Sequence, residues 1–207
     1  MPFRVEICGG ISSGKTTLAT LLQGDGDIVY ENFQAVPFWQ KFYSSPRLHA
    51  FETELSFLLQ HYHQVKQRTV HASGLVVCDF SFWLDAAYAQ VSLDGGKLAA
   101  FRAVWRQVLL ELGQPQLIVR LECSPQTELR RVQARGRDAE TSVSLEFLQS
   151  LENTITGELL AAQSVPLLAF DSDKQNFAFD SRTQEQCRRI VLARVELEKS
   201  TRKVRGT

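Results

Sequence analysis

A glycine-rich segment near the start of the sequence has the residue types needed to bind phosphate. Residues 9–17 satisfy the pattern G-x-x-x-x-G-K-[ST]. Glycines let the backbone approach closely, so that its N–H groups and the start of the next helix can point at phosphate oxygens. Lys15 would add a positive charge, and the Thr16 hydroxyl would bind Mg²⁺. The pattern predicts a nucleoside triphosphate site formed by Gly9, Gly10, Ile11, Ser12, Ser13, Gly14, Lys15, Thr16 and Thr17.

Two acidic residues follow short apolar runs that have the character of buried strands. Glu31 comes directly after the run Asp27–Tyr30, and Asp79 comes directly after Leu75–Cys78. Ligands gather beyond the carboxyl ends of parallel strands, so we expect both carboxylates near the terminal phosphate. One can accept the proton of an attacking hydroxyl, and the other can hold a metal ion. The alternative is that each acid only caps the next helix, which applies more to Asp79 because a helical pattern follows it.

Three arginines form a further candidate group. Arg131 and Arg135 lie four residues apart on one face of a predicted helix, and Arg137 follows Gly136, which weakens that helix. Such a segment, about residues 131–141, can fold over phosphates as a lid, and guanidinium groups suit phosphate oxygens and developing charge. The alternative is a solvated helix face on which Glu128 and Glu140 neutralise the arginines.

These residues need a scaffold in which several strand ends meet at one edge of a sheet. Apolar runs alternate with longer stretches of helical periodicity, which is typical of a covered parallel sheet. We predict one domain, residues 1–207, with a three-layer α/β/α fold of the P-loop NTPase type, a five-stranded parallel sheet and the arginine lid. The predicted strands are Arg4–Cys8, Asp27–Tyr30, Leu75–Cys78, Leu117–Leu121 and Leu167–Phe170. The predicted helices are Thr16–Leu22, Leu48–His71, Leu98–Leu112, Pro125–Ala134, Leu145–Ala162 and Gln184–Leu197.

Composition and charge exclude several classes of protein. The 207 residues include 23 Lys and Arg and 23 Asp and Glu, so no broad positive field exists to hold a nucleic acid. The apolar runs are far too short to cross a bilayer, and the first ten residues lack the long apolar core of a signal peptide. We therefore expect a soluble, cytoplasmic protein that binds neither nucleic acid nor membranes.

The cysteines and the C-terminus carry less information. Cys8, Cys78, Cys123 and Cys187 show no paired spacing of metal ligands, and we expect them to be reduced core residues. The segment from about residue 199 to 207 is polar and basic, and we expect a frayed, solvated tail.

The phosphate pattern alone does not identify the reaction, since such loops serve switches, motors and small-molecule kinases. The sequence contains neither D-x-x-G nor N-K-x-D, which a guanine-nucleotide switch would use. A chain of 207 residues is too small for a motor with its coupling segments. A small kinase is the favoured class.

Taken together, the spaced motifs resemble the deoxyribonucleoside kinase family, and within it the bacterial deoxyguanosine/deoxyadenosine kinase branch. The resemblance runs from the phosphate loop to about Phe170. It implies phosphorylation of the 5′-hydroxyl of a deoxynucleoside by ATP and Mg²⁺. It also implies a homodimer through helices like Leu48–His71 and Leu98–Leu112, although both could equally pack internally. The matching segments are Gly9–Thr17, Tyr30-Glu31-Asn32, Phe42-Tyr43-x-x-Pro46-x-x-x-Ala50-Phe51-x-x-Glu54, Asp79-Phe80-Ser81 and Arg131-x-x-x-Arg135-Gly136-Arg137-x-x-Glu140.

The resemblance implies roles for individual residues. Glu31 matches the general base for the 5′-hydroxyl, and Asp79 matches the acid that organises magnesium. Tyr43 and Glu140 match the pair that holds the sugar 3′-hydroxyl, and the segment Asp171–Phe179 matches the loop beside the donor adenine. The residues that match base-reading positions are Glu54, His61 and Asp85. The alternative for this last group is a buried helix face with a packed core histidine.

Three positions depart from the family pattern. Glu54 replaces the usual glutamine, His61 replaces an arginine, and Phe80 replaces the arginine of the D/E-R-S motif. An ionised glutamate only accepts hydrogen bonds, and guanine presents two adjacent donors. We therefore expect a purine preference, with deoxyguanosine ahead of deoxyadenosine. Because Phe80 is neutral, we expect the three lid arginines to carry more of the charge that develops during transfer.

Two alternatives stay open at this point. A nucleoside monophosphate kinase, similar to thymidylate kinase, shares the sheet, the loop and the lid. Its acceptor pocket needs cations for the α-phosphate, whereas Tyr43, Glu31 and Glu54 make this pocket acidic. A nucleotide-binding regulatory module is the second alternative, but it would leave Glu31 and Asp79 without an evident task.

Overall fold

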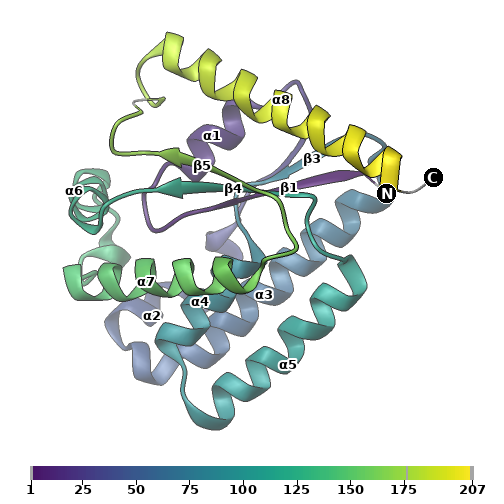
Figure 1. Ribbon diagram of the computed structural model, residues 1–207. Coiled ribbons are helices and arrows are strands. Elements are labelled where there is room, and N and C mark those ends of the chain that lie inside the picture. Colours follow the sequence, from purple (N-terminus) through teal and green to yellow (C-terminus); the bar gives the residue numbers. More distant parts are fainter. Residues whose placement is uncertain (1, 176, 206–207) are drawn as a thin grey trace.

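The sheet has five parallel strands, as predicted, with the first strand at its centre (Figure 1). The computed structural model describes residues 2–175 and 177–205. The strands pair in the order β2-β3-β1-β4-β5, and each pairing is parallel. The carboxyl ends of all five strands therefore share one edge of the sheet. The strands are β1 (Phe3–Cys8), β2 (Asp27–Val29), β3 (Leu75–Cys78), β4 (Leu117–Glu122) and β5 (Leu167–Asp171).

Helices connect the strands and agree closely with the predicted segments. They are α1 (Lys15–Leu21), α2 (Trp39–Ser44), α3 (Pro46–His71), α4 (Phe82–Ser92), α5 (Gly95–Leu112), α6 (Pro125–Arg135), α7 (Leu145–Ala161) and α8 (Ser181–Arg205), with 3-10 turns at Phe33–Ala35 and Asp138–Glu140. α4 corresponds to the helical pattern that the sequence shows after Asp79. Among the α-helices of the described residues, the short α2 is the one that the sequence pattern did not predict. In the described part of the chain, none of these helices has both the length and the apolar character of a membrane span.

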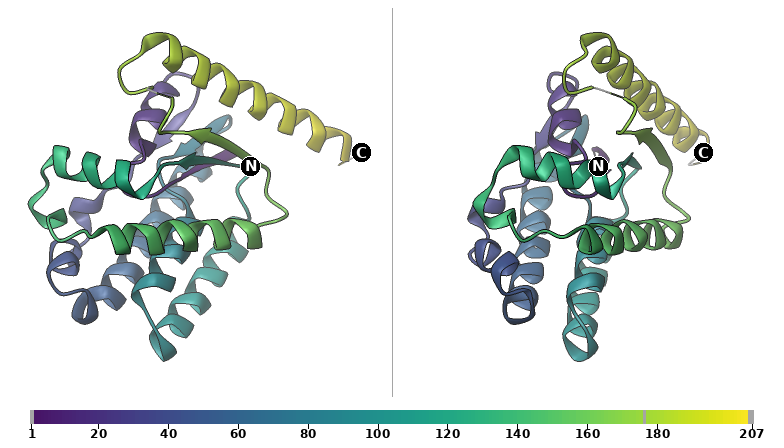
Figure 2. Two further views of the ribbon diagram at one scale, coloured as in Figure 1. Left: turned by 60° about the vertical axis from the view of Figure 1, so that its left-hand side comes forward. Right: turned by 90° about the vertical axis from the view of Figure 1, so that its left-hand side faces the viewer.

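Helices cover both faces of the sheet and create the expected three layers (Figure 2). On one face, Val5 and Ile7 of β1 pack in a cluster with residues of α1 and α8. On the other face, Cys8 belongs to a larger cluster with residues of α3, α4, α5 and α7. The alternation along β1 follows from the two-residue period of a strand. Both faces are covered, which explains why the strands are mostly apolar, with Arg4, Glu6 and Arg120 as buried exceptions.

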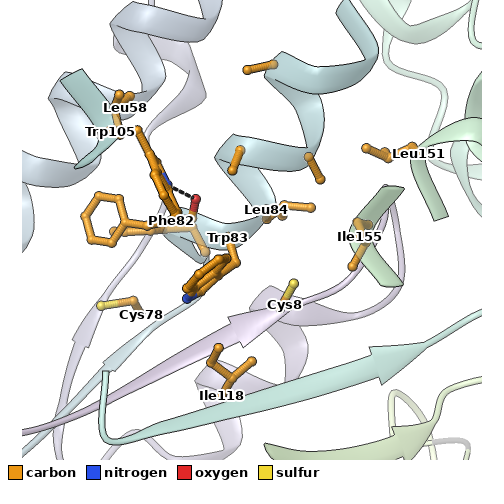
Figure 3. Packing of buried hydrophobic residues seen from close by; sticks show 14 of the residues in the cluster. Cys8, Leu58, Cys78, Phe82, Trp83, Leu84, Trp105, Ile118, Leu151 and Ile155 are labelled. Carbon is orange, nitrogen blue, oxygen red and sulfur yellow. Dashed lines mark hydrogen bonds between the residues drawn. The ribbon is translucent and has the colours of Figure 1, made fainter. Parts of the chain in front are cut away.

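Figure 3 shows the larger cluster, in which aromatic side chains fix the start of α4. The rings of Trp83 and Trp105 meet edge to face with centroids 5.0 Å apart. Nε1 of Trp105 donates a hydrogen bond of 2.6 Å to the carbonyl oxygen of Phe82. Cys8 and Cys78 pack nearby, and all four cysteines are buried and free, as predicted. This packing holds the segment that follows β3, which carries Asp79.

The C-terminal segment differs from the prediction of a frayed tail. α8 continues as a regular helix to Arg205, and residues 206 and 207 lie outside the described residues. The Lys199 ammonium lies 5.9 Å and the Arg202 guanidinium 6.0 Å from the centroid of the Phe3 ring. Contacts between cations and an aromatic face stabilise such a helix end although its residues are polar.

Candidate active site

The glycine-rich segment forms a loop between β1 and α1, as predicted. Gly14, the residue before α1, has a φ of 103°, which a residue with a side chain rarely adopts. A Cβ at Gly10 would collide with the carboxylate of Glu128, whose side chain would have to move. The backbone can therefore wrap closely around a phosphate group.

Lys15 already lies inside this loop. Its Nζ donates hydrogen bonds of 2.9 Å to the carbonyl oxygens of Gly9 and Gly10. Phosphate oxygens are stronger acceptors than carbonyls because they carry negative charge. Lys15 can therefore exchange these contacts for a phosphate without leaving the loop.

The segment Asp171–Phe179, expected beside the donor base, passes close to the same loop. The side chain of Phe177 is buried, and a Cβ at Gly14 would lie 2.9 Å from its ring. The Ser172 hydroxyl donates a hydrogen bond of 2.7 Å to the carbonyl oxygen of Ser13. Residue 176 of this segment lies outside the described residues.

Asp79 connects the phosphate loop to the chain after β2. Its Oδ2 accepts a hydrogen bond of 2.9 Å from the Thr16 hydroxyl, and its Oδ1 accepts one of 2.5 Å from the Glu31 N–H. Burial and the nearby Glu31 charge raise the pKa of Asp79, while these two hydrogen bonds oppose the increase. The alternative that Asp79 caps α4 is wrong, because the side chain of Ser81 accepts from the Trp83 N–H and caps that helix.

Glu6, which the sequence patterns did not single out, anchors the backbone just after Asp79. Its buried carboxylate accepts hydrogen bonds from the Ser81 hydroxyl at 3.0 Å and from the Phe82 N–H at 3.1 Å. Nε of Arg4 donates to the same carboxylate at 3.1 Å. The sequence did contain a signal that could have identified Glu6: Arg4 and Glu6 are charged residues inside a strand expected to be buried on both faces.

A cavity of about 530 Å³ opens beside the phosphate loop. Its wall combines that loop with the two acids after β2 and β3 and with side chains of α2, α3, α4 and the lid. The predicted site residues in this wall are Ile11, Ser12, Gly14, Lys15, Thr16, Thr17, Glu31, Tyr43, Glu54, Asp79, Asp85, Arg135, Arg137 and Glu140. The predicted site residues that do not line the cavity are Gly9, Gly10, Ser13, His61 and Arg131.

Glu31, His61 and Asp85 form a connected row of polar groups beside the cavity. Nδ1 of His61 lies 3.1 and 3.0 Å from the two carboxylate oxygens of Asp85. Nε2 of the same ring lies 3.6 Å from Oε1 of Glu31. His61 is buried, as the core alternative expects, yet both of its nitrogens face carboxylates of the predicted site.

These three groups change one another's pKa. Burial lowers the pKa of His61, but the charge and hydrogen bond of Asp85, together with the nearby charge of Glu31, raise it to about 10. Burial disfavours the ionised form of Glu31, but the close approach of the His61 ring and the charges of Lys15 and Arg137 lower its pKa below the ordinary value. At neutral pH, His61 is therefore protonated and Glu31 is ionised.

Two of the three predicted lid arginines face the cavity. α6 ends at Arg135, and Gly136, with a φ of 64°, closes the helix. The buried Glu140 pairs with Arg135 and, at 3.2 Å, with Arg137. The Arg137 guanidinium also lies 4.2 Å from the centroid of the Phe33 ring. The positive charge of both arginines is thus shared with one carboxylate.

Arg131 occupies a different place, next to the phosphate loop. Its guanidinium donates to the Ser12 carbonyl at 3.3 Å and to the hydroxyl and carbonyl of Ser172 at 2.9 and 2.7 Å. It therefore connects α6 and the end of β5 to the loop. The alternative of a solvated helix face holds in part: Glu140 pairs with Arg135 and Arg137, but Glu128 and Glu140 are both buried.

Tyr43 and Glu140, the predicted sugar-binding pair, lie in the same wall of the cavity. Burial raises the pKa of Tyr43, and the charges of Glu140, Glu31 and Glu54 raise it further. The Tyr43 hydroxyl therefore stays neutral and can both donate and accept a hydrogen bond. α2, which carries it, is held by a hydrogen bond of 2.7 Å from the Ser142 hydroxyl to the Tyr43 carbonyl.

Glu54 faces the cavity from α3 with only 5% of its surface exposed. Burial raises its pKa to about 8, and the negative charge of Asp85 adds to this increase. At neutral pH, most of the Glu54 carboxyl is therefore protonated and can donate as well as accept. The acceptor-only Glu54 expected from the sequence is the form that exists above this pKa.

Comparison with known proteins supports the expected family. The family model described as deoxynucleoside kinase matches residues 5–195. The chain belongs to the deoxynucleoside kinase family. The matched range contains every residue of the site described above, and the resemblance inferred from the spaced motifs is confirmed.

This kinase is similar in sequence to two characterised relatives. The deoxyguanosine kinase of Bacillus subtilis (strain 168) is 27% identical over 192 residues, which cover 86% of this chain and 90% of the relative. The deoxyadenosine kinase of Dictyostelium discoideum is 30% identical over 159 residues, which cover 72% of this chain and 63% of the relative.

Solved structures agree on the fold. Deoxyadenosine kinase from M. mycoides with bound dCTP has a TM-score of 0.76 and 17% identity, and the match covers 93% of this chain and 98% of that one. The same protein with the products dCMP and a flexible dCDP has a TM-score of 0.78 and 16% identity, with the same coverage. Family and relatives together make this chain an enzyme, a kinase that uses a nucleotide, which argues against the regulatory module.

Proposed function

We propose that this kinase transfers the γ-phosphoryl group of ATP, with Mg²⁺, to the 5′-hydroxyl of a purine deoxynucleoside. The observation that carries the proposal is the Glu31 carboxylate, which is ionised, 34% exposed and part of the cavity wall next to the phosphate loop. A carboxylate in this position can accept the proton of an attacking hydroxyl. The names of the relatives, deoxyguanosine kinase and deoxyadenosine kinase, support the class of acceptor.

The residues around the phosphate loop fit a nucleotide with its metal ion. The Thr16 hydroxyl and the Asp79 carboxylate, 2.9 Å apart, are oxygen ligands of the kind that Mg²⁺ prefers. Lys15 would exchange the carbonyls of Gly9 and Gly10 for phosphate oxygens. When bound, magnesium offsets negative charge on the phosphates.

In the proposed reaction, Glu31 takes the proton of the 5′-hydroxyl while the oxygen forms a bond to the γ-phosphorus. The bond between that phosphorus and the bridging oxygen breaks, and ADP leaves with the electron pair. Lys15, Arg135 and Arg137 offset the negative charge on the group in transfer.

Tyr43 and Glu140 suit the 3′-hydroxyl of the sugar. A neutral phenol and a carboxylate together provide a donor and an acceptor for it. Because Glu140 also pairs with Arg135 and Arg137, binding of the sugar and the position of the lid are linked.

Glu54 is the group that remains to read the base, since Asp85 and His61 already contact each other. When ionised, Glu54 can accept from both N1–H and the amino group of guanine. When protonated, it can donate to N1 of adenine and accept from the adenine amino group. We therefore propose a purine preference in which deoxyguanosine is favoured above the pKa of Glu54 and deoxyadenosine below it.

The charge of the cavity argues against a monophosphate acceptor. Glu31, Asp85 and Glu140 are acidic, and a 5′-phosphate would meet the Glu31 carboxylate where a neutral hydroxyl is expected. The alternative of a thymidylate kinase-like reaction needs cations at this position.

A panel of nucleosides tests the proposal. The purified enzyme is incubated with ATP, Mg²⁺ and each of deoxyguanosine, deoxyadenosine, deoxycytidine and thymidine, or with the matching 5′-monophosphates, and the products are separated by chromatography. We expect the two purine deoxynucleosides to react fastest and the monophosphates to be inert. Reaction of the monophosphates in preference to the nucleosides contradicts the proposal. Deoxycytidine as the best substrate also contradicts it.

Glu31→Gln isolates the role of the base. The carboxamide keeps the shape but cannot take the proton, so kcat should fall by about 10²- to 10⁴-fold. ATP affinity, measured by calorimetry, should not change. The matched control is Glu146→Gln on an exposed part of α7, which should retain full activity. If Glu31→Gln is as active as the control, Glu31 is not the base.

The homodimer implied by the resemblance stays a prediction. α3 and α5 pack against each other, so part of each helix is internal, whereas Leu59 and Leu110 on these helices are exposed. Size-exclusion chromatography with light scattering should give twice the chain mass of 23.4 kDa. A mass equal to that of one chain contradicts it.

A further inference from the structure

A histidine lies between two carboxylates beside the cavity, and only one of its nitrogens has a hydrogen-bond partner. His61 is 1% exposed. Its Nδ1 contacts both oxygens of Asp85, whereas Nε2 lies 3.6 Å from Oε1 of Glu31 and forms no hydrogen bond among the described residues. A buried polar nitrogen without a partner is costly. This atom therefore indicates a contact that is completed when the substrate binds.

Phe80 holds the imidazole in this orientation. The two rings stack with centroids 3.8 Å apart and planes inclined by 6°, and the edge of Phe82 packs against Phe80 in turn. Phe80 cannot supply a charge near Glu31, but the face of its ring favours a cation stacked on it. Phe80 stands where the family motif has an arginine, and its ring stabilises the cationic form of His61.

The groups that face His61 come from four segments. Asp85 of α4 and Glu31 after β2 are acidic, while Phe80 after β3 and Phe57 of α3 are uncharged. Burial lowers the pKa of His61, but the two carboxylates raise it to about 10. The imidazolium is therefore the form present at neutral pH.

We propose that His61 is a positioning residue for phosphoryl transfer, which replaces the arginine absent at Phe80 and holds the Glu31 carboxylate toward the acceptor hydroxyl. The inference rests on the proposed function, in which Glu31 is the general base. Asp85 orients the imidazolium, and a small movement of Glu31 converts the 3.6 Å approach into a hydrogen bond. In this proposal, His61 and Asp85 position the group that acts on the sugar 5′-hydroxyl. They do not bind the edge of the base, which was their role expected from the sequence.

The protons balance in this arrangement. Glu31 gains one proton from the 5′-hydroxyl as the new bond to phosphorus forms, and His61 keeps its own proton throughout. Because the imidazolium lowers the pKa of Glu31, as do Lys15 and Arg137, Glu31 returns the gained proton to water after the product leaves.

A titration of the histidine ring nitrogens tests the charge of His61 without relying on activity. The ¹⁵N-labelled protein contains four histidines, and His61→Gln assigns the His61 signals by their loss. We expect His61 to keep its proton to a pH well above the ordinary histidine pKa of about 6.5. The control is His63, which is exposed on the same helix. Asp85→Asn and Glu31→Gln should each lower the His61 midpoint, and His63→Gln should leave it unchanged. A neutral His61 at about pH 7 overturns the proposal.

Kinetics test the positioning role. His61→Gln should lower kcat about 10- to 100-fold with an unchanged KM for ATP. The loss should be equal for deoxyguanosine, deoxyadenosine and deoxycytidine, since Glu31 acts on the sugar. Unequal losses would identify His61 as a base-reading residue and overturn the proposal.

Substitutions that return a cation complete the test. His61→Arg keeps a positive charge and should retain more kcat than His61→Gln. Phe80→Arg should restore about tenfold in kcat to His61→Gln, whereas in the wild type it places two cations in contact and should lower activity. Circular dichroism checks that each variant is folded. Equal loss in His61→Arg and His61→Gln overturns the proposal even if Phe80→Arg fails to fold.

The two proposals fail in different ways. A wild-type enzyme that phosphorylates no nucleoside overturns the proposed function and the kinetic role of His61 with it. A neutral His61 in an enzyme that does phosphorylate nucleosides overturns only the positioning role.

Discussion

The donor end and the acceptor end of the cavity are built in opposite ways. The donor end is one continuous segment, residues 9–17, whose backbone and Lys15 surround the phosphate position. The proposed acceptor end takes single side chains from several segments, among them the acids Glu31, Glu54, Asp85 and Glu140. Backbone groups do not titrate, whereas neighbouring buried acids shift one another's pKa. Phosphate binding should therefore tolerate changes of pH to which the choice of acceptor responds.

The largest effect is expected from removing the cation of the donor end. Lys15→Ala should lower kcat/KM by at least about 10³-fold and weaken ATP binding in calorimetry. The free energy of unfolding should change little, because Nζ contacts only two carbonyls, of Gly9 and Gly10. The control is Lys41→Ala, at an exposed position of α2. If Lys15→Ala has the same kcat/KM and ATP affinity as Lys41→Ala, the phosphates of ATP do not bind at this loop.

A smaller effect is expected where the two ends meet, at the lid. Arg137→Ala removes a cation that acts on Glu31 and should lower kcat by about 10²-fold. Arg131→Ala breaks the contacts with Ser12 and Ser172 and should mainly raise the KM for ATP. Steady-state kinetics separate the two outcomes. Unchanged turnover after replacing each lid arginine would show that they do not compensate for the neutral Phe80.

The smallest effect concerns the acceptor end alone, and it is a change of preference with pH. Glu54 has a pKa of about 8, so its ionised fraction rises through this value. The ratio of deoxyguanosine to deoxyadenosine turnover should increase about tenfold between about pH 7.5 and 8.5. Both nucleosides compete in one reaction, so that other titrating groups affect them equally.

Glu54→Gln is the control for this preference. The glutamine keeps a donor and an acceptor at every pH, so its ratio of products should not depend on pH. A wild-type ratio that is equally constant would show that Glu54 does not change its charge on the bound base.

The sequence predicts the donor end well because its signals are local. The phosphate loop is contiguous, and the strands of the sheet are short, mostly apolar segments that are buried on both faces. The helix boundaries follow from the same periodicity, and Gly136 ends α6 where its weak helical propensity indicates. The short α2 was missed because Trp39–Ser44 is too brief to show a period.

The acceptor end could be predicted only in part. Glu31, Tyr43 and Asp79 were singled out, but the contact between His61 and Glu31 joins residues that are thirty positions apart and has no local signature. Burial also reversed the expected protonation of Glu54 at neutral pH. In the C-terminal helix, Lys199 and Arg202 belong to the segment that composition alone describes as frayed, yet both lie against the ring of Phe3.

Glu140 has one further consequence, for the fate of ATP when no acceptor is present. In the structure this single carboxylate neutralises both Arg135 and Arg137. A sugar hydroxyl that binds Glu140, as proposed, would compete for the same oxygens and release guanidinium charge toward the phosphates. Without the sugar, both cations would stay paired, so a water molecule in the cavity would meet a weakly activated terminal phosphate. We therefore expect slow hydrolysis of ATP when no acceptor is bound.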